Sequence, residues 1–310
     1  MRRVDGWDGL SRATFRRPAV AVGVFDGVHR GHRHVLEQLR ALADELDGEA
    51  VVVTFDTHPR AVLSGAAPTP LVSLAHRLVL LERLGVDATV VLPFDERTRD
   101  LPWESFVADV LVRGMGARGL LFGFDTCFGR GGLGTYDVVA PFAERLGLHV
   151  RRAPAIAVEG RPVSATRIRD AVARGDLEEA AALLGRPPSL YGTVVHGDGR
   201  GRSIGFPTAN VDPTGEWLPP RGVYQVVVTL RGRRWAAVAN LGVRPTVGDG
   251  AARPTLEVHV PGVDFDFYGE AVEVEFVRRL REERRFDSLA ALVAQIRLDV
   301  ASLGGAGSLP

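Results

Sequence analysis

The hydrophobic pattern of the chain changes once, at Arg186-Pro187-Pro188, and this change limits the possible folds more than any other feature. Before it, short apolar runs alternate with stretches whose apolar residues recur at helical spacing. After it, apolar and polar residues alternate with a period of two, between Gly, Pro and Asp turns. We therefore expect two domains, residues 1–185 and 186–310, a number that 310 residues can supply.

The first domain is predicted to be an α/β fold. Its predicted strands are Ala19–Val24, Ala50–Phe55, Ala88–Leu92, Gly119–Phe122 and His149–Ala153. Helical stretches separate them, and one, capped by Ser73, should end at Gly85. A further helical stretch, Thr166–Leu184, should break near Gly175. This alternation indicates a parallel sheet covered by helices on both faces, with ligands at the carboxyl ends of the strands.

The second domain is predicted to be a small antiparallel barrel or sandwich. The alternating segments are Gly222–Leu230, Trp235–Leu241, Thr255–Val260 and Ala271–Phe276. A final helix should begin at Ser288.

Charge and composition exclude several functions. The 38 basic and 38 acidic residues give a net charge of zero, so no global basic field attracts nucleic acid. The chain has no lysine, which rules out a Walker P-loop and a Schiff-base lysine. Any phosphate must be held by arginine, histidine, backbone amides or a metal ion.

The single cysteine, Cys127, allows no internal disulfide, and we expect it to be a small buried residue rather than a reactive thiol. No apolar run is long enough to span a bilayer, and the N-terminus lacks the apolar core of a signal peptide. We expect no membrane association and a cytoplasmic protein.

The segment Gly23–His32 joins the first predicted strand to the first helix. His29 and His32 are three residues apart at the helix entry, where unpaired N–H groups favour an anion. They therefore suit the charge that develops on an α-phosphate. The alternatives are a zinc pair or two surface histidines.

Three further loops could complete this site. Thr54–Arg60 places His58 and Arg60 at the end of the second strand. The glycine-rich loop 123–132 suits a flat ring or a phosphate. In the segment 163–169, Ser164 or Thr166 can cap a helix, and Arg167 and Arg169 could close over a triphosphate.

A second site is predicted around Gly205–Asn210, which reads Gly-Phe-Pro-Thr-Ala-Asn after a Gly/Arg-rich stretch. In an extended segment Thr208 and Asn210 point to one side and offer the hard oxygens that Mg²⁺ prefers. Glu257 and His259 share the polar face of a strand, so Glu257 could be a general base toward an alcohol. The alternatives are an ordinary turn and a solvent-facing glutamate.

Together these motifs resemble those of the bacterial bifunctional riboflavin kinase/FMN adenylyltransferases, also called FAD synthetases. The resemblance runs from about Val20 to Asp299. The matching segments are Gly23–His32, Thr54–Arg60, Ser164–Arg169, Gly205–Asn210, Leu218–Tyr224, Ala239–Thr246, Asp266–Gly269 and Leu280–Phe286. It implies a Rossmann-like nucleotidyltransferase domain followed by a riboflavin kinase β-barrel, with riboflavin, FMN and ATP as substrates and Mg²⁺ as cofactor.

The resemblance also implies residue roles. In the first domain, ATP would be bound by Gly23, Phe25, Asp26, His29, His32, His58, Ser164, Thr166 and Arg169. FMN would attack the α-phosphorus and release pyrophosphate. In the second domain, ATP would be bound by Gly199, Arg202 and Gly205, and Mg²⁺ by Thr208 and Asn210. Glu257 would activate the ribityl hydroxyl. Flavin contacts would come from Asp125, position 282 (Glu282) and Phe286.

The first domain departs from the family pattern, whereas the second matches almost throughout. Asp56-Thr57 stands where Glu-Pro is usual, Thr126 replaces an aromatic residue, and Ala165 replaces a serine. Leu133-Gly-Thr135 stands where a basic residue and a Gly-Asp or Gly-Asn are usual. Losing an aromatic wall would weaken stacking by about 1 kcal/mol. The alternatives are a riboflavin kinase whose first domain is degenerate or transfers another nucleotide, and a flavin-binding protein without activity.

Overall fold

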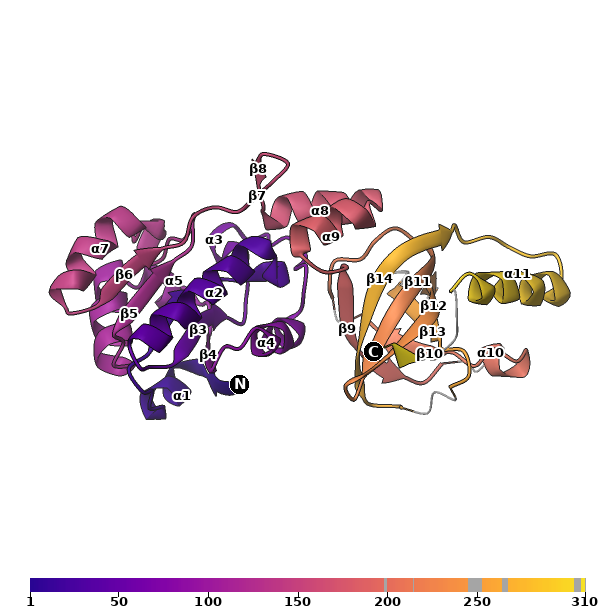
Figure 1. The fold of residues 1–310 in the computed structure, drawn as a ribbon, viewed down its shortest axis with the longest axis horizontal. Coiled ribbons are helices and arrows are strands. Elements are labelled where there is room, and N and C mark those ends of the chain that lie inside the picture. The colour runs from indigo at the N-terminus through magenta and orange to yellow at the C-terminus, as the bar shows by residue number, and fades with distance from the viewer. Residues whose placement is uncertain (198–199, 214, 245–252, 264–266, 304–307, 310) are drawn as a thin grey trace. The chain divides into compact units, whose positions relative to one another are not determined.

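A computed structural model describes residues 1–310 except 198–199, 214, 245–252, 264–266, 304–307 and 310 (Figure 1). The chain forms two compact units. The first consists of Met1–Pro70 and Leu74–Ala165, and the second of Leu71–Ser73 and Thr166–Pro310. The short segment Leu71–Ser73 therefore belongs to the second unit although it lies early in the sequence. The functional boundary at 185/186 stays a prediction.

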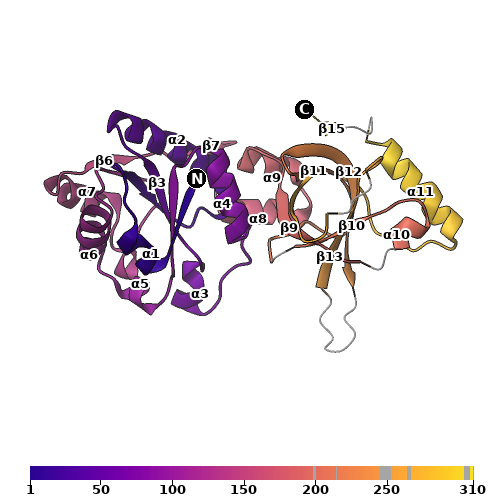
Figure 2. The same ribbon diagram turned by 90° about the horizontal axis from the view of Figure 1, so that it is seen from below.

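The first unit is built on a six-stranded sheet whose pairings are all parallel. The strand order is β1 (Arg2–Asp5), β4 (Ala88–Leu92), β3 (Ala50–Phe55), β2 (Ala19–Val22), β5 (Gly119–Phe122) and β6 (His149–Arg152). Strands β2 to β5 are buried along their whole length, because helices flank both faces (Figure 2). This confirms the predicted α/β fold.

The helices of this unit are α1 (Gly6–Arg12), α2 (Arg30–Glu45), α3 (Pro59–Ser64), α4 (Leu74–Arg83), α5 (Glu96–Asp100), α6 (Trp103–Ser105) and α7 (Tyr136–Arg145). Shorter helical turns are η1 (Asp26–Val28) and η3 (Arg130–Gly132), and η2 (Phe106–Gly114) is a π-helix. A two-stranded hairpin, β7 (Ala157–Val158) and β8 (Arg161–Pro162), precedes α8. The strand order changes direction between β2 and β5, so the loops after these two strands share the switch point where ligands bind in such folds.

The second unit is a closed antiparallel barrel, which decides between the barrel and the sandwich. Its strands follow the order β11 (Gly222–Leu230), β14 (Ala271–Arg281), β9 (Ser189–Val195), β10 (Ala209–Asp212), β13 (Arg253–His259) and β12 (Arg233–Arg244). Pairing of β11 with β12 closes the ring, and β15 (Ser308–Leu309) adds to β12. Apolar residues of alternate positions fill the interior, among them Tyr224, Phe276 and Leu256.

Helices α8 (Ala165–Arg174), α9 (Leu177–Leu184), α10 (Arg200–Ser203) and α11 (Leu289–Ala301) complete this part of the chain. The break predicted near Gly175 is present, with a φ of 75° at that glycine. The N–H of Ala291 donates to the Ser288 hydroxyl, which caps α11 at the residue where the final helix was predicted to begin. Across the part of the chain that is described, no helix is both long and apolar enough to cross a membrane.

Strand β9 was not predicted, and its position depends on Gly192. A Cβ at Gly192 would lie 2.1 Å from the carbonyl oxygen of Asp212, so only glycine allows β9 and β10 to approach here.

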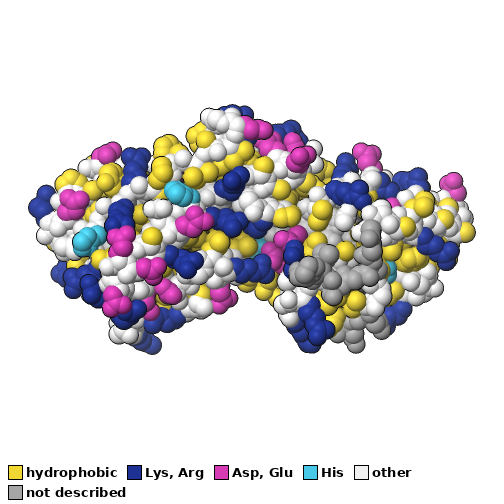
Figure 3. Space-filling model, in the orientation of Figure 1, with side chains coloured by type: hydrophobic (Ala, Val, Ile, Leu, Met, Phe, Trp, Pro, Cys, Tyr) yellow, Lys and Arg dark blue, Asp and Glu magenta, His cyan; other side chains and the backbone are white. Residues whose placement is uncertain are grey.

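On the face shown in Figure 3, acidic and basic side chains are interspersed, as the zero net charge suggests.

Candidate active sites

The first candidate site is the turn that leaves β2. Three of its residues have left-handed backbone conformations, Phe25 (φ 51°), Gly27 (φ 75°) and Val28 (φ 41°). Such a conformation is costly for Val28 because its side chain is β-branched. His29 then caps α2, and its Nδ1 accepts the N–H of His32 at 3.3 Å. The turn thereby fixes both histidines at the N-terminus of α2, as predicted.

The two imidazoles form a stacked pair. Their ring centroids are 3.6 Å apart with an interplanar angle of 14°, and the Phe25 ring lies 5.1 Å from that of His32. Burial, together with the neighbouring His29 and Arg77, holds the pKa of His32 well below its ordinary 6.5. His32 is therefore neutral at pH 7 and can donate one hydrogen bond. The structure, as far as it is described, contains no group of three His, Cys, Asp or Glu side chains placed to hold a metal ion.

Arg77 on α4 lies close to this pair, and the sequence analysis missed it. Its side chain is buried, and its Nη1 donates to the Thr54 hydroxyl at 2.8 Å and to the Phe55 carbonyl at 3.0 Å. The Thr54 hydroxyl donates in turn to the carbonyl of Val24 at 3.2 Å. Arginine at a helical position usually indicates a solvated face, so the sequence pattern offers no signal for it.

The second loop, after β3, uses its polar groups mainly for local structure. His58 caps α3, and its Nδ1 accepts the N–H of Arg60 at 3.1 Å. Asp56, which stands where glutamate is usual in the resembling family, accepts the N–H of Phe94 at 3.2 Å. Arg60 is exposed. The predicted roles of His58 and Arg60 toward phosphate stay predictions.

The third loop, after β5, is closed by Thr126, whose hydroxyl accepts the N–H of Gly123 at 3.0 Å. Phe128 is buried, whereas Phe124 is 49% exposed and lies beneath the guanidinium of Arg152 at 5.9 Å. An aromatic surface therefore remains at this loop despite Thr126. The prediction that Cys127 is buried is wrong, because its thiol is exposed in this glycine-rich loop. Asp125 of the same loop is also exposed.

The segment from Ser164 to Arg169 opens α8, and its two arginines differ. Arg167 is buried, and its Nε is 3.0 Å from Oε1 of Glu179, so it forms an ion pair within the second unit. Arg169 is half-buried, and its carbonyl accepts the indole N–H of Trp217 at 3.1 Å. Ser164 and Thr166 are exposed.

The second candidate site lies on the barrel wall, where three polar side chains form a row across adjacent strands. Glu257 on β13 pairs in register with Asn210 on β10 and with Asn240 on β12. Their neighbours Ala209, Val258 and Ala239 fill the barrel core, so the row faces the other side of the sheet. Asn240 was missed as a site residue, although its alternation with Ala239 and Leu241 places it on this face.

Two glycines that precede β10, Gly197 and Gly201, lie directly against the polar side chains at the start of this strand. A Cβ at Gly197 would lie 1.8 Å from the Asn210 amide, and one at Gly201 would lie 3.2 Å from the Thr208 hydroxyl. Gly205 has a φ of 85°, and Arg202 is exposed. His259 Nδ1 is 2.8 Å from the carbonyl oxygen of Pro207, which fixes the start of β10. Gly199 lies outside the described residues.

The segment after β14 borders the same face. Glu283 Oε1 accepts the Asn240 amide at 3.2 Å. Two guanidinium groups lie over the Phe286 ring, that of Arg284 at 4.7 Å and that of Arg281 at 5.7 Å from its centroid. Position 282 carries a carboxylate, so a cationic contact with a flavin here would come from these neighbouring arginines instead.

Arg281 is fixed by a buried ion pair that joins β14 to α11. Its Nη2 is 2.8 Å from Oδ2 of Asp299, and the Gln295 amide donates to the same carboxylate at 2.8 Å. Arg281 of the predicted flavin segment is therefore held by the C-terminal helix.

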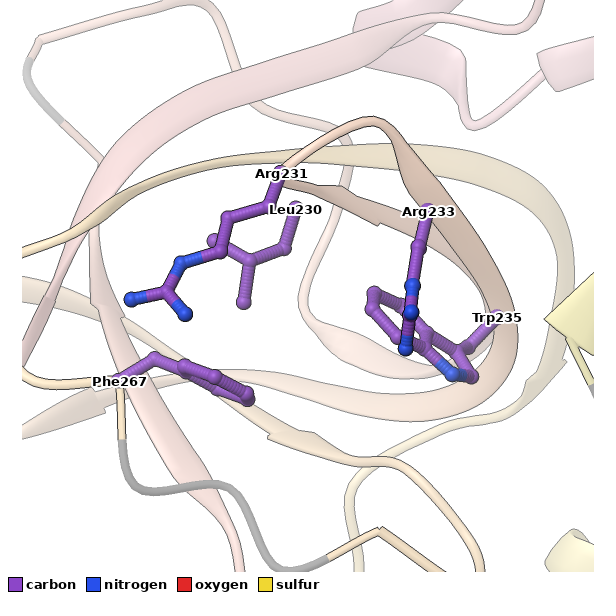
Figure 4. Close-up of a pocket in the computed structure, with 5 residues that line it drawn as sticks. All are labelled: Leu230, Arg231, Arg233, Trp235 and Phe267. Atoms are coloured by element: carbon purple, nitrogen blue, oxygen red, sulfur yellow. The ribbon is translucent and has the colours of Figure 1, made fainter.

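A pocket of about 360 Å³ opens where β11 turns into β12 (Figure 4). Figure 4 shows Arg231 above Phe267 on one side and Arg233 beside Trp235 on the other. Arg231 forms an ion pair with Glu270, at 2.8 Å between Nε and Oε2. Arg233 and Asn240 are seven residues apart on β12, about 20 Å along a strand, so this pocket is separate from the Glu257 row.

Two protein-family models together match most of the chain. The model of the FAD synthetase family matches residues 11–167, and the riboflavin kinase model matches residues 184–304. A crystal structure described as a macrolide-efflux protein from Streptococcus pneumoniae has a TM-score of 0.83, with 30% identity, covering 98% of this chain and 99% of that one.

Among curated proteins, the bifunctional riboflavin kinase/FMN adenylyltransferase of Pseudomonas fluorescens is 40% identical over 97% of this chain and 96% of its own length. Those of Escherichia coli K12 (96% of each chain) and Bacillus subtilis 168 (91% and 90%) are 36% and 33% identical. This chain belongs to the bifunctional riboflavin kinase/FMN adenylyltransferase family, with its FAD synthetase domain N-terminal and its riboflavin kinase domain C-terminal.

Proposed function

We propose that the Asn210–Glu257–Asn240 row is the riboflavin kinase site. The observation that carries this proposal is the register that places a carboxylate between two amides on one polar face. Glu257 would take the proton of the ribityl 5′-hydroxyl as that oxygen attacks the γ-phosphorus of ATP and ADP leaves.

Thr208 and Asn210 would hold the magnesium ion of the nucleotide. A hydroxyl and an amide oxygen are suitable donors for a cation that also binds phosphate oxygens. Asn210 lies against Gly197 and Thr208 against Gly201, where a Cβ would also lie 2.3 Å from the Phe206 carbonyl oxygen, so phosphates could approach backbone N–H groups there. Magnesium would neutralise charge on the β- and γ-phosphates.

The histidine turn after β2 would be the adenylyltransferase site. The FMN phosphate would attack the α-phosphorus of a second ATP, and pyrophosphate would leave. His29 and His32 at the N-terminus of α2 would donate to the charge that develops on the α-phosphate. His58 and Ser164 would contact the same nucleotide, and Phe124 with Asp125 would border the flavin.

The test follows both products in one reaction. Purified protein is incubated with riboflavin, ATP and Mg²⁺, and FMN and FAD are separated by chromatography over time. Glu257→Gln should abolish FMN formation and still convert supplied FMN to FAD. A double variant, His29→Ala with His32→Ala, should do the reverse and accumulate FMN.

Each variant is the other's control for folding, because each keeps one activity. Loss of both activities in either variant would contradict the assignment of two separate sites. FMN accumulating without FAD in the unaltered protein would favour the alternative in which the first domain is degenerate or transfers another nucleotide. FAD formed as fast as FMN would show that Thr126 and Ala165 are tolerated.

A further inference from the structure

Arg77 is a buried cation without an acidic partner in contact. The residue is 5% exposed, and the contacts of its guanidinium in the described part of the chain are with the Thr54 hydroxyl and the Phe55 carbonyl. The Nε atom is buried and has no hydrogen-bond partner among those residues. Asp26 and Asp56 act on it only electrostatically.

Such a residue is expensive to keep in a folded protein. A guanidinium stays charged at any physiological pH, and removing it from water is costly unless an anion compensates. Two hydrogen bonds, to the Thr54 hydroxyl and the Phe55 carbonyl, offset only part of that cost. The remaining positive charge suits a site that an anionic ligand enters.

The position of Arg77 indicates which ligand. Thr54 links it to the Val24 carbonyl, and Val24 begins the turn that continues through Phe25 and Val28 to the histidine pair. The Nδ1 atom of His32 is also buried without a hydrogen-bond partner within the described structure. Two buried nitrogen atoms, Nε of Arg77 and Nδ1 of His32, therefore lie close to the proposed triphosphate site without a hydrogen-bond partner among the described residues.

We propose that Arg77 is a positioning residue for adenylyl transfer, which holds the strained histidine turn through Thr54 and supplies a fixed positive charge to the ATP phosphates. In a chain without lysine, this buried arginine takes the place of a flexible surface cation. The inference rests on the proposed roles of His29 and His32.

The proposal is tested in the full chain with three variants, Arg77→Gln, Arg77→Lys and Thr54→Val. FAD formation from FMN and ATP is measured as kcat and KM, and riboflavin phosphorylation by the same sample is the internal control. Arg77→Gln should lower kcat/KM for ATP by about 10²-fold, as loss of one preorganised donor does. Arg77→Lys should recover at least about a tenth of the wild-type value because it restores the charge.

Thr54→Val tests the connecting hydroxyl with little change in shape. It should lower kcat by up to about tenfold and change KM less, because the turn positions groups for the transition state. Combined with Arg77→Gln, it should add less than its separate effect, since both act through one relay.

Equal losses in adenylyl transfer and kinase activity in both Arg77→Gln and Thr54→Val would overturn the proposal, because they would indicate a general folding defect. Unchanged FAD formation in Arg77→Gln would overturn it directly, and Lys behaving like Gln would remove the role of charge. If the His29→Ala/His32→Ala protein still forms FAD normally, the histidine assignment fails whatever Arg77 does.

Discussion

Glu216 offers a sharp test of how the second unit is held together. Its side chain is 4% exposed. Oε1 accepts the backbone N–H of Ser73 at 2.8 Å, and Oε2 accepts that of Tyr191 at 3.0 Å. One buried carboxylate thus joins the segment Leu71–Ser73 to strand β9. We expect Glu216→Ala to destabilise the unit strongly.

The magnitude follows from the two bonds. A hydrogen bond to a charged group contributes about 1.5–3 kcal/mol, so removing both costs about 3–6 kcal/mol, a large part of a typical domain's 5–15 kcal/mol. Glu216→Gln keeps one acceptor and turns an NH₂ group toward the other N–H, so it should cost about half as much. Glu178→Ala is the matched control, because its carboxylate belongs to the same unit and is exposed.

Two measurements address this prediction. Urea unfolding, followed through loss of kinase activity, gives the change in stability, and hydrogen exchange reports on the amides of Ser73 and Tyr191. Both amides should lose protection in Glu216→Ala and keep it in Glu178→Ala. The reasoning fails if Glu216→Ala changes stability by no more than the control, or if the two amides stay protected.

Three other predictions follow from the same structure. Below pH 6.5 the unfolded chain protonates His32 while the folded chain does not. The free energy of unfolding should therefore fall by up to about 1.4 kcal/mol per pH unit until the lowered folded pKa is reached. In urea titrations at a series of pH values, the free energy of unfolding should depend less on pH in His32→Gln, and an equal dependence would contradict the direction of the pKa shift. Gly192→Ala should unfold the barrel at markedly lower temperature, whereas Gly9→Ala, with its nearest neighbour at 3.4 Å, should be neutral in the same thermal scan. Asp299→Ala leaves Arg281 without its buried partner, so KM for riboflavin should rise with little change in KM for ATP, and a selective change in KM for ATP would refute the placement of the flavin.

The sequence predicts the central strands well because their burial on both faces leaves continuous apolar runs. Residues 50–55, 88–92 and 119–122 are strands at the predicted limits. Strand β1 was missed since only Val4 of its four residues is buried, and β9 because Gly192 interrupts its pattern. Edge exposure and close backbone approach leave little trace in hydrophobic periodicity.

The same physical reasons decide which residues of the candidate sites could be predicted from the sequence. His29, Asn210 and Glu257 could be predicted because they stand at strand ends or alternate with core residues. Arg77 could not, since its burial results from contacts with β3, which lies over twenty residues earlier in the chain. Cys127 was misjudged because residue type alone does not reveal a loop that turns its thiol outward.

The segment Leu71–Ser73 has a consequence for how the protein is made. Ser73 leaves the ribosome 143 residues before Glu216, the residue that binds its amide. At about 5–20 residues per second, this tripeptide waits roughly 7–30 s for its partner. If the first unit folds during synthesis, it does so before the partners of Leu71–Ser73 in the second unit have been translated. A gene cut at the junction between the halves would therefore produce a C-terminal fragment in which the buried carboxylate of Glu216 lacks the N–H of Ser73.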